Sequence, residues 1–109
     1  MNPYQLMKLI HSKNVEFIET VHFQNRLAGR DIPHDWIRRV FTNPQGGIVG
    51  GIIQQDEIGG EKFLLYYSLD GDKDLVIVVK ARQFKSKVRL TLITAYLQEK
   101  RRRMREDGK

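Results

Sequence analysis

Phe63-Leu-Leu-Tyr-Tyr-Ser-Leu-Asp-Gly-Asp-Lys-Asp-Leu-Val-Ile-Val-Val79 is the stretch that decides the fold of this chain. Two runs rich in aromatic and β-branched residues flank Asp70-Gly71-Asp72, and an Asp-Gly turn between such runs is a strong signal of a β-hairpin. Both runs are apolar at nearly every position, which is typical of strands covered on both faces. The stretch therefore predicts two central strands, near 62–68 and 75–82.

Glycine pairs and one further apolar segment indicate the remaining strands. Gly46-Gly47, Gly50-Gly51 and Gly59-Gly60 interrupt short apolar runs, as turns do, and the segment after Val88 is again rich in strand-forming residues. We expect strands near 48–54 and 88–97 beside the central pair. The result is a four-stranded, mainly antiparallel sheet.

The residues before Pro44 have helical periodicity. Apolar side chains recur at spacings of three and four in 3–13 and again in 16–28, where Gly29 is a stop signal. Pro33 suits the first turn of a third helix. The sequence predicts helices near 4–12, 16–28 and 33–42, followed by the sheet. This order of two to three N-terminal helices and then strands is typical of an α+β domain.

Composition excludes several classes of protein. The chain has 109 residues, 40% of them apolar, and no cysteine, so one compact domain is expected without disulfides or a thiolate zinc site. No apolar run reaches the ~20 residues that span a bilayer. The histidines lack the spacing of a metal site, and the glycine pairs do not form a phosphate-binding loop. We expect a soluble cytoplasmic protein with no metal, cofactor or membrane partner.

Positive charge is concentrated at the C-terminal end. Residues 85–109 carry nine Lys/Arg and three Asp/Glu, which accounts for the whole net charge of +6. We interpret residues 1–97 as the folded domain and 98–109 as a basic helical tail. Such a localised field attracts a polyanion, so RNA is the expected partner. The alternative is a solvated terminal helix that only aids solubility.

A motif near the middle of the chain resembles a known family. The chain is similar to the pattern His-x3-Arg... Arg-x-Ile-(Ser/Pro)... Asn-Pro. The matching residues are His22-Phe-Gln-Asn-Arg26, Gly29-Arg-Asp-Ile-Pro33, the helical run Trp36-Ile-Arg-Arg-Val-Phe41, and Asn43-Pro44. The pattern is that of a family of small prokaryotic domains of unknown function. The similarity continues to Leu92-Ile-Thr-Ala-Tyr96, which resembles the family's closing strand.

The resemblance implies a fold and an activity. Such domains are thought to be related to the RelE-like, barnase-like and colicin-like ribonuclease toxins, which share N-terminal helices followed by a four-stranded antiparallel sheet. It therefore implies a RelE/barnase-like domain. The resemblance also implies that Thr94 and Tyr96 occupy the closing-strand positions where related toxins keep polar catalytic groups. The extra N-terminal helix, the glycine-rich segment 46–60 and the basic tail depart from the family pattern.

His22, Arg26 and Arg30 are the candidate catalytic group on the helical part. Metal-free RNA cleavage needs a base, an acid and cations for the charge that develops on phosphorus. His22 can serve as base or acid near neutral pH, and Arg26 lies four residues on, on the same helix face. Arg30, just past the helix end, could join them at one phosphate. Alternatively, His22 caps or packs the helix while the arginines form ion pairs with Glu19, Asp31 or Asp35.

The strands supply a second candidate group. Strict alternation in 88–97 predicts that Thr94 and Tyr96 share a face with Leu90 and Leu92, away from Arg89. Tyr96 could donate to a phosphate or stack on a base, or it could be an ordinary aromatic at the edge of the core. The candidate nucleic-acid-binding residues are the cations of the last strands and the tail: Lys80, Arg82, Lys85, Lys87, Arg89, Lys100, Arg101, Arg102 and Arg103.

Three functions follow from these groups. The favoured one is a metal-independent endoribonuclease, a toxin of a toxin-antitoxin or related conflict system, with His22, Arg26, Arg30, Thr94 and Tyr96 at its site. The second is a non-catalytic RNA- or DNA-binding module that uses the cations. The third is an interaction protein whose basic tail docks on an acidic protein such as an antitoxin.

Overall fold

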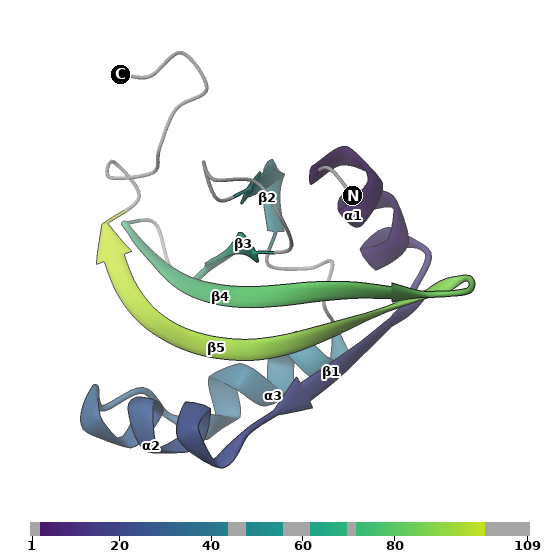
Figure 1. The fold of residues 1–109 in the computed structure, drawn as a ribbon. Helices are drawn as coiled ribbons and strands as arrows, with labels where there is room; N and C mark the ends of the chain where they lie inside the picture. The colour runs from purple at the N-terminus through teal and green to yellow at the C-terminus, as the bar shows by residue number, and fades with distance from the viewer. Residues whose placement is uncertain (1–2, 44–47, 56–61, 70–71, 100–109) are drawn as a thin grey trace.

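Three helices and a five-stranded sheet make up the protein in a computed structural model, which describes residues 3–43, 48–55, 62–69 and 72–99 (Figure 1). In chain order the elements are α1 (Pro3–His11), β1 (Val15–Glu19), α2 (Val21–Gly29), α3 (His34–Thr42), β2 (Ile48–Gln55), β3 (Lys62–Ser68), β4 (Lys73–Phe84) and β5 (Lys87–Glu99). The α+β class is therefore confirmed.

The four predicted strands are present and pair as expected. The sheet order is β1-β5-β4-β3-β2, and β2, β3, β4 and β5 pair with one another antiparallel. Leu65 lies opposite Ile77 across the predicted hairpin between β3 and β4. The hairpin of β4 and β5 turns at Lys85, which has a positive φ of 50°, and forms the long curved ribbon of Figure 1.

The start of the predicted second helix is wrong. Residues 15–19 form β1, which pairs parallel with β5 and makes the sheet mixed, with five strands in place of four. Val15 and Phe17 alternate toward the core, so a strand buries them better than a helix would. The helix begins only after Thr20, whose hydroxyl accepts a hydrogen bond of 3.1 Å from the Phe23 N–H and caps α2.

One face of the sheet, called here the core face, shares a hydrophobic cluster with all three helices. The helices contribute Leu6 and Ile10 from α1, Phe23 and Leu27 from α2, and Ile37 and Val40 from α3. The register places the buried strand residues of this cluster on the same face: Phe63, Leu65, Tyr67, Leu75, Ile77, Val79, Ala81, Val88, Leu90, Leu92 and Ala95. Removing these side chains from water is the main stabilising contribution to the fold.

A β-bulge in β5 changes which residues share a face. Val79 lies opposite Leu92 but Val78 lies opposite Thr94, so Ile93 is the extra residue. Each side chain after the bulge is therefore on the other face from the one that strict alternation predicts. Thr94 does not share a face with Leu92, and the predicted grouping is wrong in this respect. A bulge also bends its strand, in keeping with the curvature of β5 in Figure 1.

The last strand is longer than predicted. β5 continues through Glu99, so the expected helical tail does not begin at Gln98, which lies opposite Asp74 in the sheet. The rest of the predicted tail, 100–109, lies outside the described residues. Within the described part of the chain, no helix is long and apolar enough to cross a membrane.

Candidate nucleic-acid interface

Five exposed cations gather at one end of the face opposite the core face. We call this group the basic end. Because pairs across the strands share a face and side chains alternate along each strand, the register puts all of its members together on that face: Lys62, Lys80, Arg82, Lys87 and Arg89. Four of the predicted nucleic-acid-binding residues therefore share one surface, and Lys85 lies at the adjoining turn.

The basic end contains two cross-strand pairs of like charge. Lys62 lies directly opposite Lys80, and Arg82 lies directly opposite Arg89. Like charges in such pairs destabilise a sheet. Glu16 of β1 offsets part of the repulsion, since its Oε1 is 3.2 Å from the Nε of Arg89. Among the described residues Lys62 and Lys80 have no ion-pair partner, so their charge is available to an anion.

A pocket adjoins the basic end at the turn between β4 and β5. It has a volume of about 270 Å³ and is lined by Glu16 and by the segment from Lys85 to Arg89. The side chains of Lys85 and Lys87 are exposed. Three cations and one carboxylate thus surround a space large enough for a phosphate group.

The first two residues of the candidate catalytic group contact each other on α2. The Nε of Arg26 donates a hydrogen bond of 2.9 Å to Nε2 of His22, and both side chains are exposed. With Nε2 as the acceptor, the neutral ring carries its proton on Nδ1. Because the partner of Arg26 is an uncharged ring, the positive charge of this arginine is not neutralised.

Arg30 connects the end of α2 to β5. One of its terminal nitrogens donates to the Thr94 hydroxyl at 2.8 Å and to the Ala95 carbonyl at 2.7 Å. The pairing of β1 with β5 stops where Glu19 lies opposite Leu92, so this contact falls just beyond the end of β1. The structure thus brings together Arg30 and Thr94, two candidates that are 64 residues apart in the chain.

The candidate residues form two pairs rather than one cluster. Eight residues at ~1.5 Å per residue separate His22 from Arg30 by roughly 12 Å along the helix. The guanidinium of Arg30 is held at β5 by its bonds to Thr94 and Ala95, and among the described residues no hydrogen bond joins the two pairs. Tyr96 lies two residues beyond Thr94, on the same face, and is half-buried.

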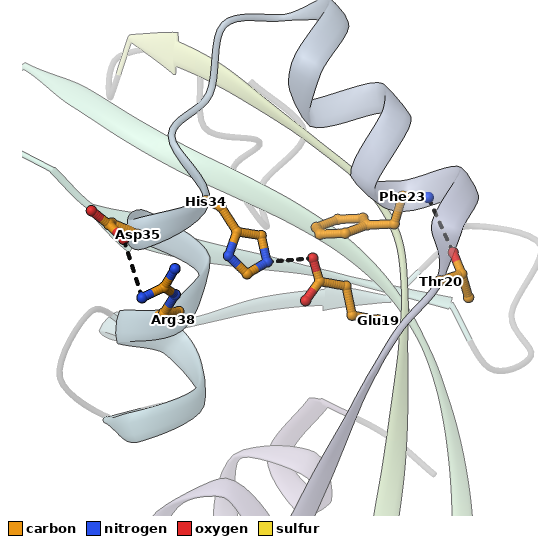
Figure 2. A network of polar contacts seen from close by, with 6 residues as sticks. All are labelled: Glu19, Thr20, Phe23, His34, Asp35 and Arg38. Carbon is orange, nitrogen blue, oxygen red and sulfur yellow. Dashed lines mark hydrogen bonds and ion pairs between the residues drawn. The ribbon is translucent and has the colours of Figure 1, made fainter.

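The junction before α3 has its own contacts (Figure 2). The Nε2 of His34 lies 2.6 Å from Oε1 of Glu19, and Arg38 lies 3.6 Å from Asp35. These carboxylates are two of the partners that the architectural alternative assigned to Arg26 and Arg30. Each has a different partner, so that alternative does not hold in the form of those ion pairs.

Four of the predicted nucleic-acid-binding residues belong to the tail. Lys100, Arg101, Arg102 and Arg103 fall outside the described residues. Among the residues that are described, no cluster of three or more histidine, cysteine, aspartate or glutamate side chains could hold a metal ion.

Lys62 belongs to the basic end but was not a predicted site residue. The signal that could have found it is its position at the start of the predicted strand near 62–68. The next predicted strand already carried the candidates Lys80 and Arg82. Finding it requires the register of β3 against β4, in which Lys62 meets Lys80. The pairing of His34 with Glu19 has no local sequence signal either, because the two residues lie on different elements.

Comparison with models of protein families, with curated proteins and with solved structures gives no match for this chain.

Proposed function

We propose that this protein binds RNA along the face of the sheet that carries the basic end, and cleaves it without a metal. The observation that supports binding is the presence of two cross-strand pairs of like charge, Lys62 opposite Lys80 and Arg82 opposite Arg89. The arrangement costs folding stability, and a polyanion bound across it relieves the repulsion. RNA is the polyanion whose chemistry also suits the candidate catalytic residues.

The path of the RNA follows β5. The basic end lies at the start of this strand, Thr94 and Tyr96 lie farther along on the same face, and the chain continues after Glu99 into Lys100 and Arg101. Cations therefore occur before and after the two polar side chains. Tyr96 offers a ring on which a base can stack.

Cleavage is assigned to the pair on α2. This helix packs on the core face, so the RNA passes around the edge of β5, where Arg30 meets Thr94, to reach the pair. When a phosphate attracts Arg26, Nε2 of His22 becomes free to accept the proton of a ribose 2′-hydroxyl. The 2′-oxygen then bonds to phosphorus, and the bond from phosphorus to the 5′-oxygen breaks. The departing 5′-oxygen takes a proton from solvent, and a 2′,3′-cyclic phosphate remains. Arg26 stabilises the charge on phosphorus, while Arg30 beside Thr94 holds a neighbouring phosphate.

A second candidate is an RNA-binding protein without catalysis. It is favoured by the 2.9 Å bond in which Arg26 occupies Nε2 of His22, the atom that a general base needs. In this case the pair serves only to bind phosphate, with Arg26 as the cation.

One experiment separates the two candidates. Purified protein is incubated with labelled single-stranded RNA in EDTA, and with DNA of the same sequence. Cleavage of the RNA but not of the DNA supports the ribonuclease. Loss of cleavage in His22→Ala but not in His11→Ala identifies His22 as the general base. A mobility shift without cleavage selects the binding module. Absence of both would refute the proposal and favour docking on an acidic protein.

Charge variants test the RNA-binding face itself. Lys62→Gln with Lys80→Gln should weaken RNA binding and reduce the slope of log affinity against log salt by about 0.7 per phosphate contact. The same variant should fold at least as stably, because it removes a repulsive pair. Lys8→Gln on α1 is the matched control. If the double variant binds RNA as the unaltered protein does, the basic end is not the interface.

A further inference from the structure

A second pocket lies between α3 and the far ends of β3 and β4. It has a volume of about 190 Å³. The helix contributes Trp36, Arg39 and Val40, the following residue Asn43 also lines it, and Tyr67 and Leu75 come from the sheet. Tyr67 belongs to the core face, so this pocket is on the other side of the sheet from the basic end.

The hydroxyl of Tyr67 is buried without a hydrogen-bond partner among the described residues. The side chain is 5% exposed, and within the described part of the chain its oxygen makes no hydrogen bond. Burial raises the pKa of this phenol well above its ordinary value, so the group remains a proton donor at all ordinary pH values. An unpaired buried donor costs stability, which a ligand carrying an acceptor would recover.

The other walls of the pocket differ in chemistry. Trp36 is half-buried and packs against the core, so its aromatic ring forms a fixed wall of the pocket. Arg39 and Asn43 are exposed at the helix end. Among the described residues the side chain of Arg39 has no ion-pair partner, whereas its neighbour Arg38 is paired with Asp35 (Figure 2). The pocket therefore combines an aromatic wall, a buried donor, an amide and an available cation.

We infer that this pocket binds the base of a nucleotide, with the phosphate of the same nucleotide at Arg39. A flat heteroaromatic ring can stack on Trp36 while its edge accepts a hydrogen bond from the Tyr67 hydroxyl and exchanges hydrogen bonds with Asn43. The volume is below the ~300–1,000 Å³ of pockets that enclose a drug-sized ligand, so the ring enters and the sugar and phosphate stay at the mouth. Arg39 is there to pair with the phosphate.

This inference does not rest on the proposed ribonuclease, because the two sites share no residue. The nucleotide has two possible sources, which are a free nucleoside monophosphate and the terminal nucleotide of an RNA strand. Their recognition chemistry in the pocket is the same, and the experiment distinguishes them.

Tryptophan fluorescence provides the test, because Trp36 is the single tryptophan of the chain. The protein is titrated with uridine 5′-monophosphate, adenosine 5′-monophosphate, the nucleoside uridine and a short RNA, with calorimetry as an independent measurement. We expect a saturable change with at least one monophosphate. Competition between RNA and the monophosphate would identify a terminal nucleotide as the source, and failure of RNA to compete would identify the free nucleotide.

Four variants locate the binding. Tyr67→Phe should weaken binding about tenfold, the usual effect of losing one hydrogen bond to a ligand. Arg39→Gln should weaken binding of the monophosphate but not binding of uridine. Arg38→Gln should change the binding of neither ligand. Lys62→Gln with Lys80→Gln should leave monophosphate binding intact, so failure of the RNA-binding proposal would not be mistaken for failure here. Absence of saturable binding, or binding that Tyr67→Phe and Arg39→Gln leave unchanged, would overturn the inference.

Discussion

Tyr67→Phe is expected to stabilise this protein in the absence of a ligand. The side chain is 5% exposed and its hydroxyl lacks a partner among the described residues. A buried polar group without a hydrogen bond costs about 1–3 kcal/mol, and phenylalanine keeps the ring and its packing. We therefore expect the free energy of unfolding to rise by about 1 kcal/mol at pH 7, near the lower limit because the pocket allows some relaxation.

Urea denaturation followed by circular dichroism measures this difference. The midpoint should rise while the slope of free energy against urea stays the same. For a domain of this size, 1 kcal/mol corresponds to roughly 4–8 °C in Tm. Tyr66→Phe is the matched control, because Tyr66 is 2% exposed on the opposite face and its hydroxyl is not among the buried groups without a partner. We expect no gain from the control.

Alkaline pH should enlarge the difference between Tyr67→Phe and the unaltered protein. Burial raises the pKa of Tyr67 in the folded state, so above pH ~10 the unfolded chain loses this proton while the folded chain keeps it. Stability contributed by the neutral phenol is present below pH ~10 and falls as pH rises, by up to about 1.4 kcal/mol per pH unit. Phenylalanine has no proton to lose, so its variant should not show this component.

A fall in stability of about 1 kcal/mol or more in Tyr67→Phe would refute the reasoning. It would show that the hydroxyl is hydrogen-bonded in the folded protein. If the free energy of unfolding fell equally with rising alkaline pH in Tyr67→Phe and in the unaltered protein, the burial of the phenol would be contradicted. The nucleotide inference would then lose one of its supports, while the Arg39 comparison would still test the pocket.

Three further outcomes are expected. A double-mutant cycle of Arg30→Gln and Thr94→Val, measured by urea unfolding, should give a coupling energy of about 1 kcal/mol, and zero coupling would contradict the contact. Glu19→Gln should lower the free energy of unfolding by about 0.2–1 kcal/mol, since its partner His34 is 42% exposed, and a loss above about 2 kcal/mol would show a larger role. Deleting Ile93 removes the bulge but leaves Leu92 and Thr94 on the faces that they now occupy, so thermal unfolding should show a cost below about 2 kcal/mol; a larger cost would mean that the fold needs the bend that the bulge introduces.

Local sequence signals determined much of this fold. The Asp-Gly turn after Ser68 and the apolar runs around it predict the hairpin of β3 and β4, which the structure contains. The helical spacing before Asn43-Pro44 predicts α3, which ends at Thr42. These features depend on neighbours within a few residues, so propensity and periodicity reveal them.

The first strand could not be recognised in this way. Val15–Glu19 is five residues long, and its apolar positions fit a helix as well as a strand. Its backbone partner is β5, more than seventy residues later, as the pairing of Val15 with Val88 shows. A short strand is stable only beside such a partner, and periodicity contains no information about it.

The candidate sites depended even more on tertiary structure. The residue types were evident from the sequence: His22, Arg26, Arg30 and the cations of the last strands. The bulge at Ile93 and the register of Lys62 against Lys80 decided which of them share a surface. The pocket at Tyr67 had no sequence signal, since a buried hydroxyl without a partner among the described residues arises only once a core has formed around it. Sequence determines the chemical groups of this protein and its local elements; long-range pairing determines which groups meet.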